Sequence, residues 1–225
     1  MLNDTGRLSR SVEDYLKAVW ALDVRGEPAT TSALAEVLEV QPSSVTGMVK
    51  RLAEWGLLAH VPYRGVHLTE SGRGEALRVI RRHRVIETYL TRVLGYAWEE
   101  VHDEAERLEH AASDRLVEAM AEALGDPSHD PHGAPIPTVD GRVEAATYDA
   151  LAEAPLGLPI EVRAVDDRGA PALREMEELG LVPGVKVQVV EHLPGGRMRI
   201  GMSGTEETRV IDAALASLIF VVPAR

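Results

Sequence analysis

The chain has 225 residues, enough for one to three compact domains, with no Cys and a formal net charge of −12. The lack of Cys excludes disulfide scaffolds, thiolate zinc sites and iron–sulfur clusters, so any metal must be bound by His and carboxylate groups. The negative charge argues against a protein that coats nucleic acid or anionic membranes through bulk charge, although it leaves local basic patches open.

No apolar run approaches the roughly 18 residues of a membrane span. Residues 1–10 are polar and lack the apolar core of a signal peptide. We therefore expect a cytoplasmic chain that has no contact with a membrane.

Residues 11–69 are predicted to form three short helices followed by two strands. The first helix has an apolar face made by Val12, Tyr15, Leu16, Val19 and Trp20. Ser11 is placed to cap this helix, with Asp14 at the acidic position of a capping box. Further helices are predicted near 31–38 and from Ser43 or Ser44 to Gly56, and a hairpin around residues 62–65. This order is typical of a winged helix-turn-helix.

Residues 70–125 are rich in Ala, Leu, Glu and Arg and are predicted to be helical almost throughout. One helix of about 24 residues has a broad apolar face, made by Val79, Ile80, Val85, Ile86, Leu90, Val93 and Leu94. Such a face is wider than one neighbouring helix needs, which favours pairing with a second copy of the chain.

The C-terminal part of the chain is predicted to be a small β domain. Pro and Gly are concentrated in residues 125–142, which indicates a long loop or linker. Five short Val-rich segments follow, at 160–165, 185–190, 197–202, 208–211 and 218–222, and they predict a small β-barrel. The fold class is therefore mainly α with a small β domain.

Residues 102–110 carry the pattern that is most informative about chemistry. On a continuous helix His102, Glu106, Glu109 and His110 share one face, because they stand at i, i+4, i+7 and i+8. His83 and Glu87, at i and i+4 of the preceding helix, can converge on the same one or two divalent ions. Neighbouring carboxylates repel each other unless a cation neutralises them. For His83 and Glu87 alone, the more common explanation is a solvated helix face.

Oxygen and imidazole donors without sulfur suit Mn²⁺ and Fe²⁺. The Irving–Williams order would still favour zinc or copper wherever those ions were available. The ligand types therefore narrow the choice of metal without fixing it.

The third helix is the candidate DNA-reading element. At or near its amino end it carries Ser43, Ser44, Thr46, Gly47, Lys50 and Arg51. Arg64 at the hairpin tip is a candidate phosphate contact. Gly47 inside a helix costs about 1 kcal/mol relative to Ala. That cost is understandable if the backbone must approach another surface closely, and a merely tolerated Gly is the alternative.

The order of these segments resembles the diphtheria toxin repressor family of metal-dependent transcriptional regulators, over nearly the whole chain. The motifs that carry the resemblance are residues 42–46, residues 101–104 with Glu109 and His110, and the loop at 130–137. Asp14 and Glu106 stand where the iron-responsive branch carries Met and Cys. Because carboxylates favour a harder ion, the chain is most similar to the manganese-responsive branch.

The resemblance implies a homodimer that binds double-stranded operator DNA when Mn²⁺, or alternatively Fe²⁺, is bound, and that represses metal-homeostasis genes without catalysis. It implies one metal site made by Asp14, Glu106, Glu109 and His110, and another made by His83, Glu87 and His102. It also implies a winged helix-turn-helix domain at 1–73, a helical metal-binding and dimerisation domain at 74–145, and a linker with an SH3-like barrel at 146–225.

The chain departs from the family's compact manganese sensors at Lys17, where those sensors carry a second acid. Glu87 and His102 instead match the ancillary site of the three-domain, iron-type members. Asp166, Asp167 and Glu175 are candidates to lend a ligand to that site, although an ordinary surface acid is the more common explanation for each one individually. Two rival functions remain open, a metal-dependent hydrolase and a metal-independent regulator.

Overall fold

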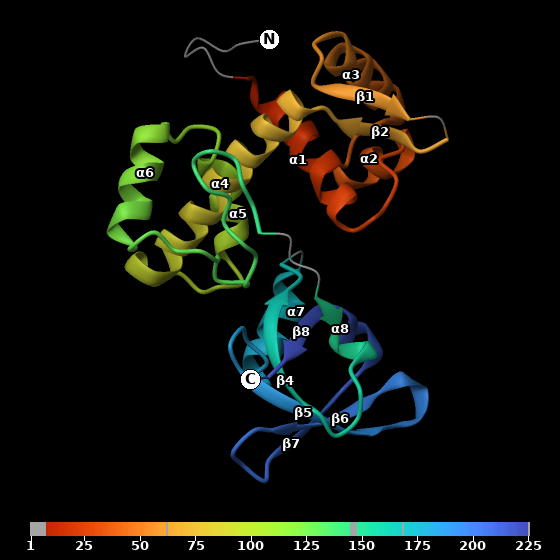
Figure 1. Ribbon diagram of the computed structural model, residues 1–225, viewed down its shortest axis with the longest axis vertical. Coiled ribbons are helices and arrows are strands. Elements are labelled where there is room, and N and C mark those ends of the chain that lie inside the picture. The colour runs from red at the N-terminus through yellow and green to blue at the C-terminus, as the bar shows by residue number, and fades with distance from the viewer. Residues whose placement is uncertain (1–7, 62, 145–147, 168, 225) are drawn as a thin grey trace. The chain divides into compact units, whose positions relative to one another are not determined.

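The computed structural model describes residues 8–61, 63–144, 148–167 and 169–224 of the chain (Figure 1). The chain divides into two compact units. Unit 1 comprises Met1–His83 and Pro137–Val143, and unit 2 comprises Arg84–Ile136 and Glu144–Arg225. Within the described residues, no helix is both long enough and apolar enough to span a membrane.

Unit 1 has the predicted order of three helices and a hairpin. The elements are α1 (Arg10–Val24), α2 (Thr31–Val37), α3 (Pro42–Glu54), β1 (Leu58–Val61), β2 (Gly65–Leu68) and the first part of α4 (Glu70–Leu94). Strands β1 and β2 pair antiparallel. Pro62, in the predicted turn, lies outside the described residues. Gly65 has a positive φ, and its Cα lies so close to the Ala29 carbonyl that a side chain there would overlap it.

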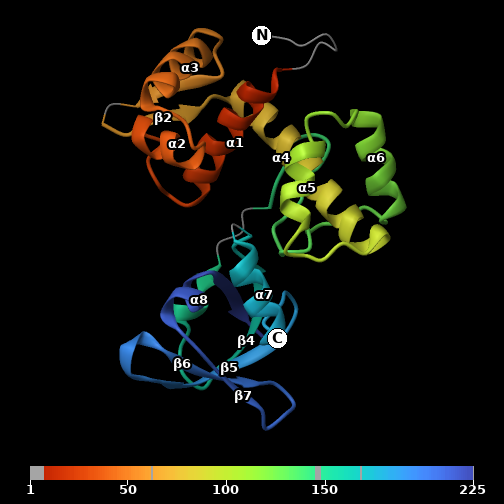
Figure 2. The same cartoon turned by 180° about the vertical axis from the view of Figure 1, so that it is seen from behind.

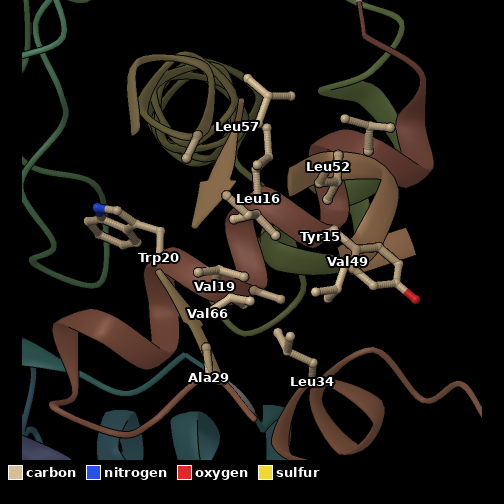
Figure 3. Packing of buried hydrophobic residues seen from close by; sticks show 14 of the residues in the cluster. Tyr15, Leu16, Val19, Trp20, Ala29, Leu34, Val49, Leu52, Leu57 and Val66 are labelled. Carbon is tan, nitrogen blue, oxygen red and sulfur yellow. The ribbon is translucent and has the colours of Figure 1, made fainter. Parts of the chain in front are cut away.

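The amphipathic pattern of the first helix is confirmed, because its apolar face forms the centre of the unit 1 core. Leu16 and Val19 of α1 lie near Val66 of β2 and Leu52 of α3 (Figure 3). Burial of these side chains is the main force that holds the three helices and the hairpin together.

The predicted cap of α1 was wrong. The helix begins at Arg10, and Ser9 occupies the cap position without a side-chain hydrogen bond, so Ser11 already lies inside the helix. Asp14 is therefore not a capping-box acid. Its carboxylate lies 3.9 Å from Nε of Arg10, one helical turn earlier.

A buried ion pair joins two helices of unit 1. Glu13 of α1 accepts a hydrogen bond of 2.5 Å from Nη2 of Arg82 of α4, and both side chains are only 6% exposed. Residue 13 precedes Asp14 and residue 82 precedes His83, so the pair fixes the two helices next to the candidate ligands.

The helical part of unit 2 is built from the second part of α4 with α5 (Val101–Leu108) and α6 (Asp114–Ala123). Buried residues of all three helices form a separate small core, which includes Ile86, Val101 and Val117. Helix α5 ends at Leu108, with Glu109 as its C-cap. The prediction of one continuous helical stripe from His102 to His110 was therefore wrong in its last two positions.

The remainder of unit 2 is a six-stranded antiparallel sheet with short helices (Figures 1 and 2). Its elements are β3 (Asp149–Ala150), η1 (Leu151–Glu153), β4 (Pro159–Val165), α7 (Ala170–Glu178), β5 (Lys186–His192), η2 (Pro194–Gly196), β6 (Met198–Met202), β7 (Thr208–Ile211), α8 (Ala213–Ser217) and β8 (Ile219–Pro223). The five predicted strands are confirmed, and β3 is additional. The strand order is β3-β8-β4-β5-β6-β7, and in the described residues no pairing joins the two outer strands.

Candidate metal centres

One candidate centre, called the second site below, has three residues from distant parts of unit 2, Glu87, His102 and Asp167. Nδ1 of His102 on α5 lies 3.4 Å from Oε1 of Glu87 on α4 and 3.5 Å from Oδ2 of Asp167, which follows β4. Glu87 is fully buried. His83 stands one helical turn before Glu87 on α4 and offers a ring nitrogen within 4.8 Å of its carboxylate. Two carboxylates therefore meet one imidazole, with a second imidazole on the same helix face.

The two carboxylates of this centre favour the protonated form of His102. Burial lowers the pKa of His102, but the hydrogen bonds with Asp167 and Glu87 outweigh burial and raise the pKa to about 10. Burial likewise raises the pKa of Asp167, and the hydrogen bond with His102 outweighs it, so this pKa is lowered from its usual value. Each carboxylate thus needs a nearby positive charge, from a proton or from a metal ion.

A further buried acid, Asp130, lies in the electrostatic field of this centre. Burial and repulsion from Glu87 raise the pKa of Asp130 to about 6, although the Arg84 guanidinium, 3.4 Å away, opposes the shift. Oδ1 of Asp130 accepts hydrogen bonds of 2.9 Å from the backbone N–H groups of His132 and Ala134. Asp130 therefore shapes the loop beside the centre and is not one of its converging ligands.

The other candidate centre, called the first site below, contains the last residues of the predicted stripe. Glu106, Glu109 and His110 each offer a ligand atom, and these atoms lie within 4.8 Å of one another. Glu109 is fully buried, and its Oε1 lies 3.2 Å from Nε2 of His110. Asp14, the fourth residue expected here, lies on α1 in unit 1.

The structure divides the stripe between two centres, so the four residues do not share one site. His102 turns to Glu87 and Asp167, while the other three gather where α5 ends. Of the three acids considered as additional ligands, Asp167 reaches the second site. Glu175 is an exposed residue of α7, and the backbone N–H of Asp166 donates to the Leu218 carbonyl.

Both centres suit a divalent cation. Their donors are carboxylate oxygens and imidazole nitrogens, and each includes a fully buried carboxylate, Glu87 or Glu109. Burying such a charge is costly unless it is paired or coordinates a metal. The absence of sulfur favours a hard or borderline ion such as Mn²⁺ or Fe²⁺.

The candidate DNA-reading residues share the exposed face of α3. Val45, Val49 and Leu52 are buried against unit 1, whereas the candidate residues are all exposed: Ser43, Ser44, Thr46, Gly47, Lys50 and Arg51. The Arg51 guanidinium lies 6.0 Å from the centre of the Trp55 ring.

At the hairpin tip, Tyr63 lies beside the predicted contact Arg64. It is fully exposed and has a φ of 65°, which is uncommon for a bulky residue.

Three family models match consecutive parts of the chain. The N-terminal DNA binding domain of the iron dependent repressors matches residues 7–66, and their metal binding and dimerisation domain matches residues 69–138. The FeoA domain matches residues 150–223.

Two relatives and two solved structures are matched over 90% or more of their own lengths. The chain is 32% identical over 208 residues to the iron-dependent repressor IdeR of Mycobacterium tuberculosis, covering 87% of this chain and 90% of that protein. It is 30% identical over 216 residues to the diphtheria toxin repressor of Corynebacterium glutamicum, covering 92% and 94%. A structure described as a manganese-dependent transcriptional repressor in complex with manganese has a TM-score of 0.87 and 35% identity, covering 95% of this chain and 100% of that chain. The manganese regulator SloR has a TM-score of 0.77 and 32% identity, covering 95% and 98%.

The family resemblance inferred from the sequence is thus confirmed, and the hydrolase alternative loses its support. The chain belongs to the diphtheria toxin repressor family of metal-dependent transcriptional repressors, which are DNA-binding regulators and not enzymes.

Proposed function

We propose that this chain is a manganese-activated repressor that acts in the cytoplasm, binds operator DNA as a homodimer and controls metal-homeostasis genes. The observation that carries the proposal is the donor chemistry of the two centres, which is entirely carboxylate and imidazole. Similarity to solved repressors described as manganese-dependent supports the choice of metal. Iron is the second candidate, because IdeR is described as iron-dependent and Fe²⁺ accepts the same donors.

We assign two metal sites. The first site consists of Asp14, Glu106, Glu109 and His110, and the second of His83, Glu87, His102 and Asp167. A bound cation supplies the positive charge that these carboxylates need to remain close together. Because Asp14 belongs to α1, its ligation would link the DNA-reading unit to the helical part of unit 2. The orientation of α3 would then depend on metal occupancy.

The basic residues of unit 1 are proposed to contact DNA phosphates. Lys50 and Arg51 lie on the exposed face of α3, and Arg64 lies at the hairpin tip. In an acidic chain such a local cluster is needed to offset repulsion from DNA. We expect binding to weaken as salt rises, with only a few phosphates neutralised by each unit.

Replacing Gly47 by Ala should change stability and DNA binding in opposite directions. Apart from its chain neighbours and the backbone of its own helix, a Cβ at Gly47 would meet no atom of the described residues within 4 Å. The free energy of unfolding should therefore rise by about 1 kcal/mol through helix propensity. If α3 approaches DNA closely, the added methyl group should reduce DNA affinity by about tenfold, as overpacking does elsewhere. Denaturant unfolding and an operator-binding titration measure the two effects. Unchanged DNA affinity would remove Gly47 from the interface.

Metal affinity at the second site should keep rising above neutral pH. The pKa of His102 is about 10, so His102 carries a proton that a metal must displace. From pH 7 to pH 8 the affinity should increase by about tenfold, since one proton is released. A His with its usual pKa near 6.5 would show almost no change in this range. Calorimetric titration with Mn²⁺ in matched buffers distinguishes the two cases.

The homodimer is proposed to form through the helical part of unit 2. Large apolar side chains remain exposed near the end of α4, where Val93 and Leu94 are 50% and 57% exposed, and at Tyr96, Leu108 and Leu116. Exposed apolar surface of this kind marks interaction sites. The model of a metal binding and dimerisation domain matches the same residues. A dimer would place two copies of α3 at a fixed spacing for two half-sites of DNA.

We propose the same three-domain division as the sequence indicates, at 1–73, 74–145 and 146–225. The three family matches support this division, and residues 145–147 at its second boundary lie outside the described part of the chain. We propose that the last domain is an SH3-like barrel, which the antiparallel strand order and the FeoA match support.

The deciding experiment is recovery of fragmented genomic DNA by purified, metal-stripped protein. It is run with Mn²⁺, with Fe²⁺ under anaerobic conditions, and with chelator. We expect a few fragments to be recovered selectively with Mn²⁺. Preference for Fe²⁺ would replace manganese by iron in the proposal. Equal recovery with chelator would contradict metal activation.

A further inference from the structure

The position of Asp167 depends on how the sheet region sits on the helices of unit 2. Glu87 and His102 come from α4 and α5, whereas Asp167 stands two residues beyond the end of β4. Its Oδ2 nevertheless lies 3.5 Å from Nδ1 of His102. Some contact between the sheet region and the helical part must therefore hold this carboxylate in place.

Trp98 and His132 make the first part of that contact. Trp98 lies between α4 and α5 but is buried in the core of the sheet region, with only 8% of its surface exposed. Its ring stacks on the ring of His132 at a centroid distance of 5.4 Å, and Nε2 of His132 lies 2.9 Å from the Trp98 carbonyl oxygen. Stacking and hydrogen bonding together hold the loop that contains His132 against the segment between α4 and α5.

The same loop also contacts strand β4 through its backbone. The backbone N–H of Val165 donates a 2.9 Å hydrogen bond to the His132 carbonyl, two residues before Asp167. At Gly133, where φ is +86°, a Cβ would overlap the Arg163 carbonyl oxygen. A continuous set of contacts therefore leads from Trp98 through His132 and Gly133 to the strand that carries Asp167.

We propose that Trp98, His132 and Gly133 form a clamp that positions Asp167 as a ligand, so that the metal affinity of the second site alone depends on the seating of the sheet region. The inference rests on the proposed function only in requiring a metal at the second site. The clamp residues do not themselves bind the metal and act through the carboxylate that they position. Their loss should resemble the loss of Asp167, without any change to Glu87 or His102.

The test compares two glycines of the same loop. Gly125 and Gly133 both have positive φ, so an Ala at either is strained, but a Cβ at Gly125 meets nothing within 4 Å. The full chain is titrated calorimetrically with Mn²⁺ in a Glu109→Gln background, which leaves the second site as the one being measured. Gly133→Ala and Asp167→Asn should each lower its affinity by about 10- to 100-fold, the usual range for groups that orient ligands. Gly125→Ala should match the background.

A second readout does not involve metal. Hydrogen exchange at the Val165 amide in the metal-free protein should be faster in Gly133→Ala and unchanged in Asp167→Asn, because only the former breaks the clamp. If Gly133→Ala folds poorly, Trp98→Leu takes its place. Trp98→Leu should likewise lower the Mn²⁺ affinity of the second site and speed hydrogen exchange at the Val165 amide. Equal affinities in Gly133→Ala and Gly125→Ala would overturn the clamp and leave the proposed function standing. A wild-type chain that binds no Mn²⁺ would overturn both.

Discussion

Replacing Glu109 by Gln should abolish the gain in DNA affinity that Mn²⁺ provides. Glu109 is fully buried, and its carboxylate lies beside His110, so it is the least solvated oxygen donor of the first site. Gln keeps the shape of the side chain but removes the charge that holds a cation. Coupling between ligand and DNA binding is typically worth 5- to 150-fold in affinity, so the operator affinity at saturating Mn²⁺ should fall by about that factor. Fluorescence anisotropy with labelled operator measures the change.

The control is Asp103→Asn, which removes one carboxylate from an exposed position of the same helix. It should leave the response to Mn²⁺ intact, because Asp103 belongs to neither centre. The DNA affinity of the metal-free protein should be the same in both variants and in the wild type. If Glu109→Gln still gained affinity with Mn²⁺, the first site could not be the activating one.

The elements of unit 1 could be predicted because their signals are local. The apolar spacing of Val12, Leu16 and Val19 repeats at the helical period, and the same residues are buried in the core. The alternation of apolar and polar residues likewise predicted strands β4 to β8, with ends within one or two residues of those in the structure. Alternation describes which face of a strand is buried, and it does not determine how a sheet closes.

The grouping of the ligands could not be read from spacing alone. The positions of His102 and His110 define one face only if the helix continues, and α5 ends at Leu108. The approach of Asp167 to His102 joins residues that are far apart in the sequence. Local patterns carry no information about such contacts. The resemblance to a family supplied the division into two sites that periodicity missed.

The ion pair between Glu13 and Arg82 also could not be predicted from the sequence. Each residue reads as one of many charged residues on a helix surface, and 69 positions separate them. Buried ion pairs contribute little net stability, since desolvation offsets their attraction. Their residues are nevertheless sensitive to replacement, because the remaining partner loses the opposite charge that offsets its desolvation.

Replacing Glu13 by Gln should therefore strongly destabilise unit 1. The substitution leaves the Arg82 guanidinium in a site where both side chains are only 6% exposed. Breaking a buried pair in this way costs about 3–5 kcal/mol. Urea unfolding of the metal-free protein, followed by the circular dichroism of its helices, should show a lower midpoint with an unchanged slope.

Two further variants test whether the lost stability comes from burying an unbalanced charge or from losing any side-chain contact of α1. Arg10→Ala removes the exposed partner of Asp14 on the same helix, and it should cost less than about 1 kcal/mol, as solvated pairs do. Glu13→Leu combined with Arg82→Met replaces both charges by apolar groups, and it should recover most of the stability lost in Glu13→Gln. If the double variant were as unstable as Glu13→Gln, specific hydrogen bonding and not charge burial would be holding α1 against α4. With stability restored, the double variant also shows whether metal activation needs the polar pair beside Asp14 and His83 or only firm packing of their helices.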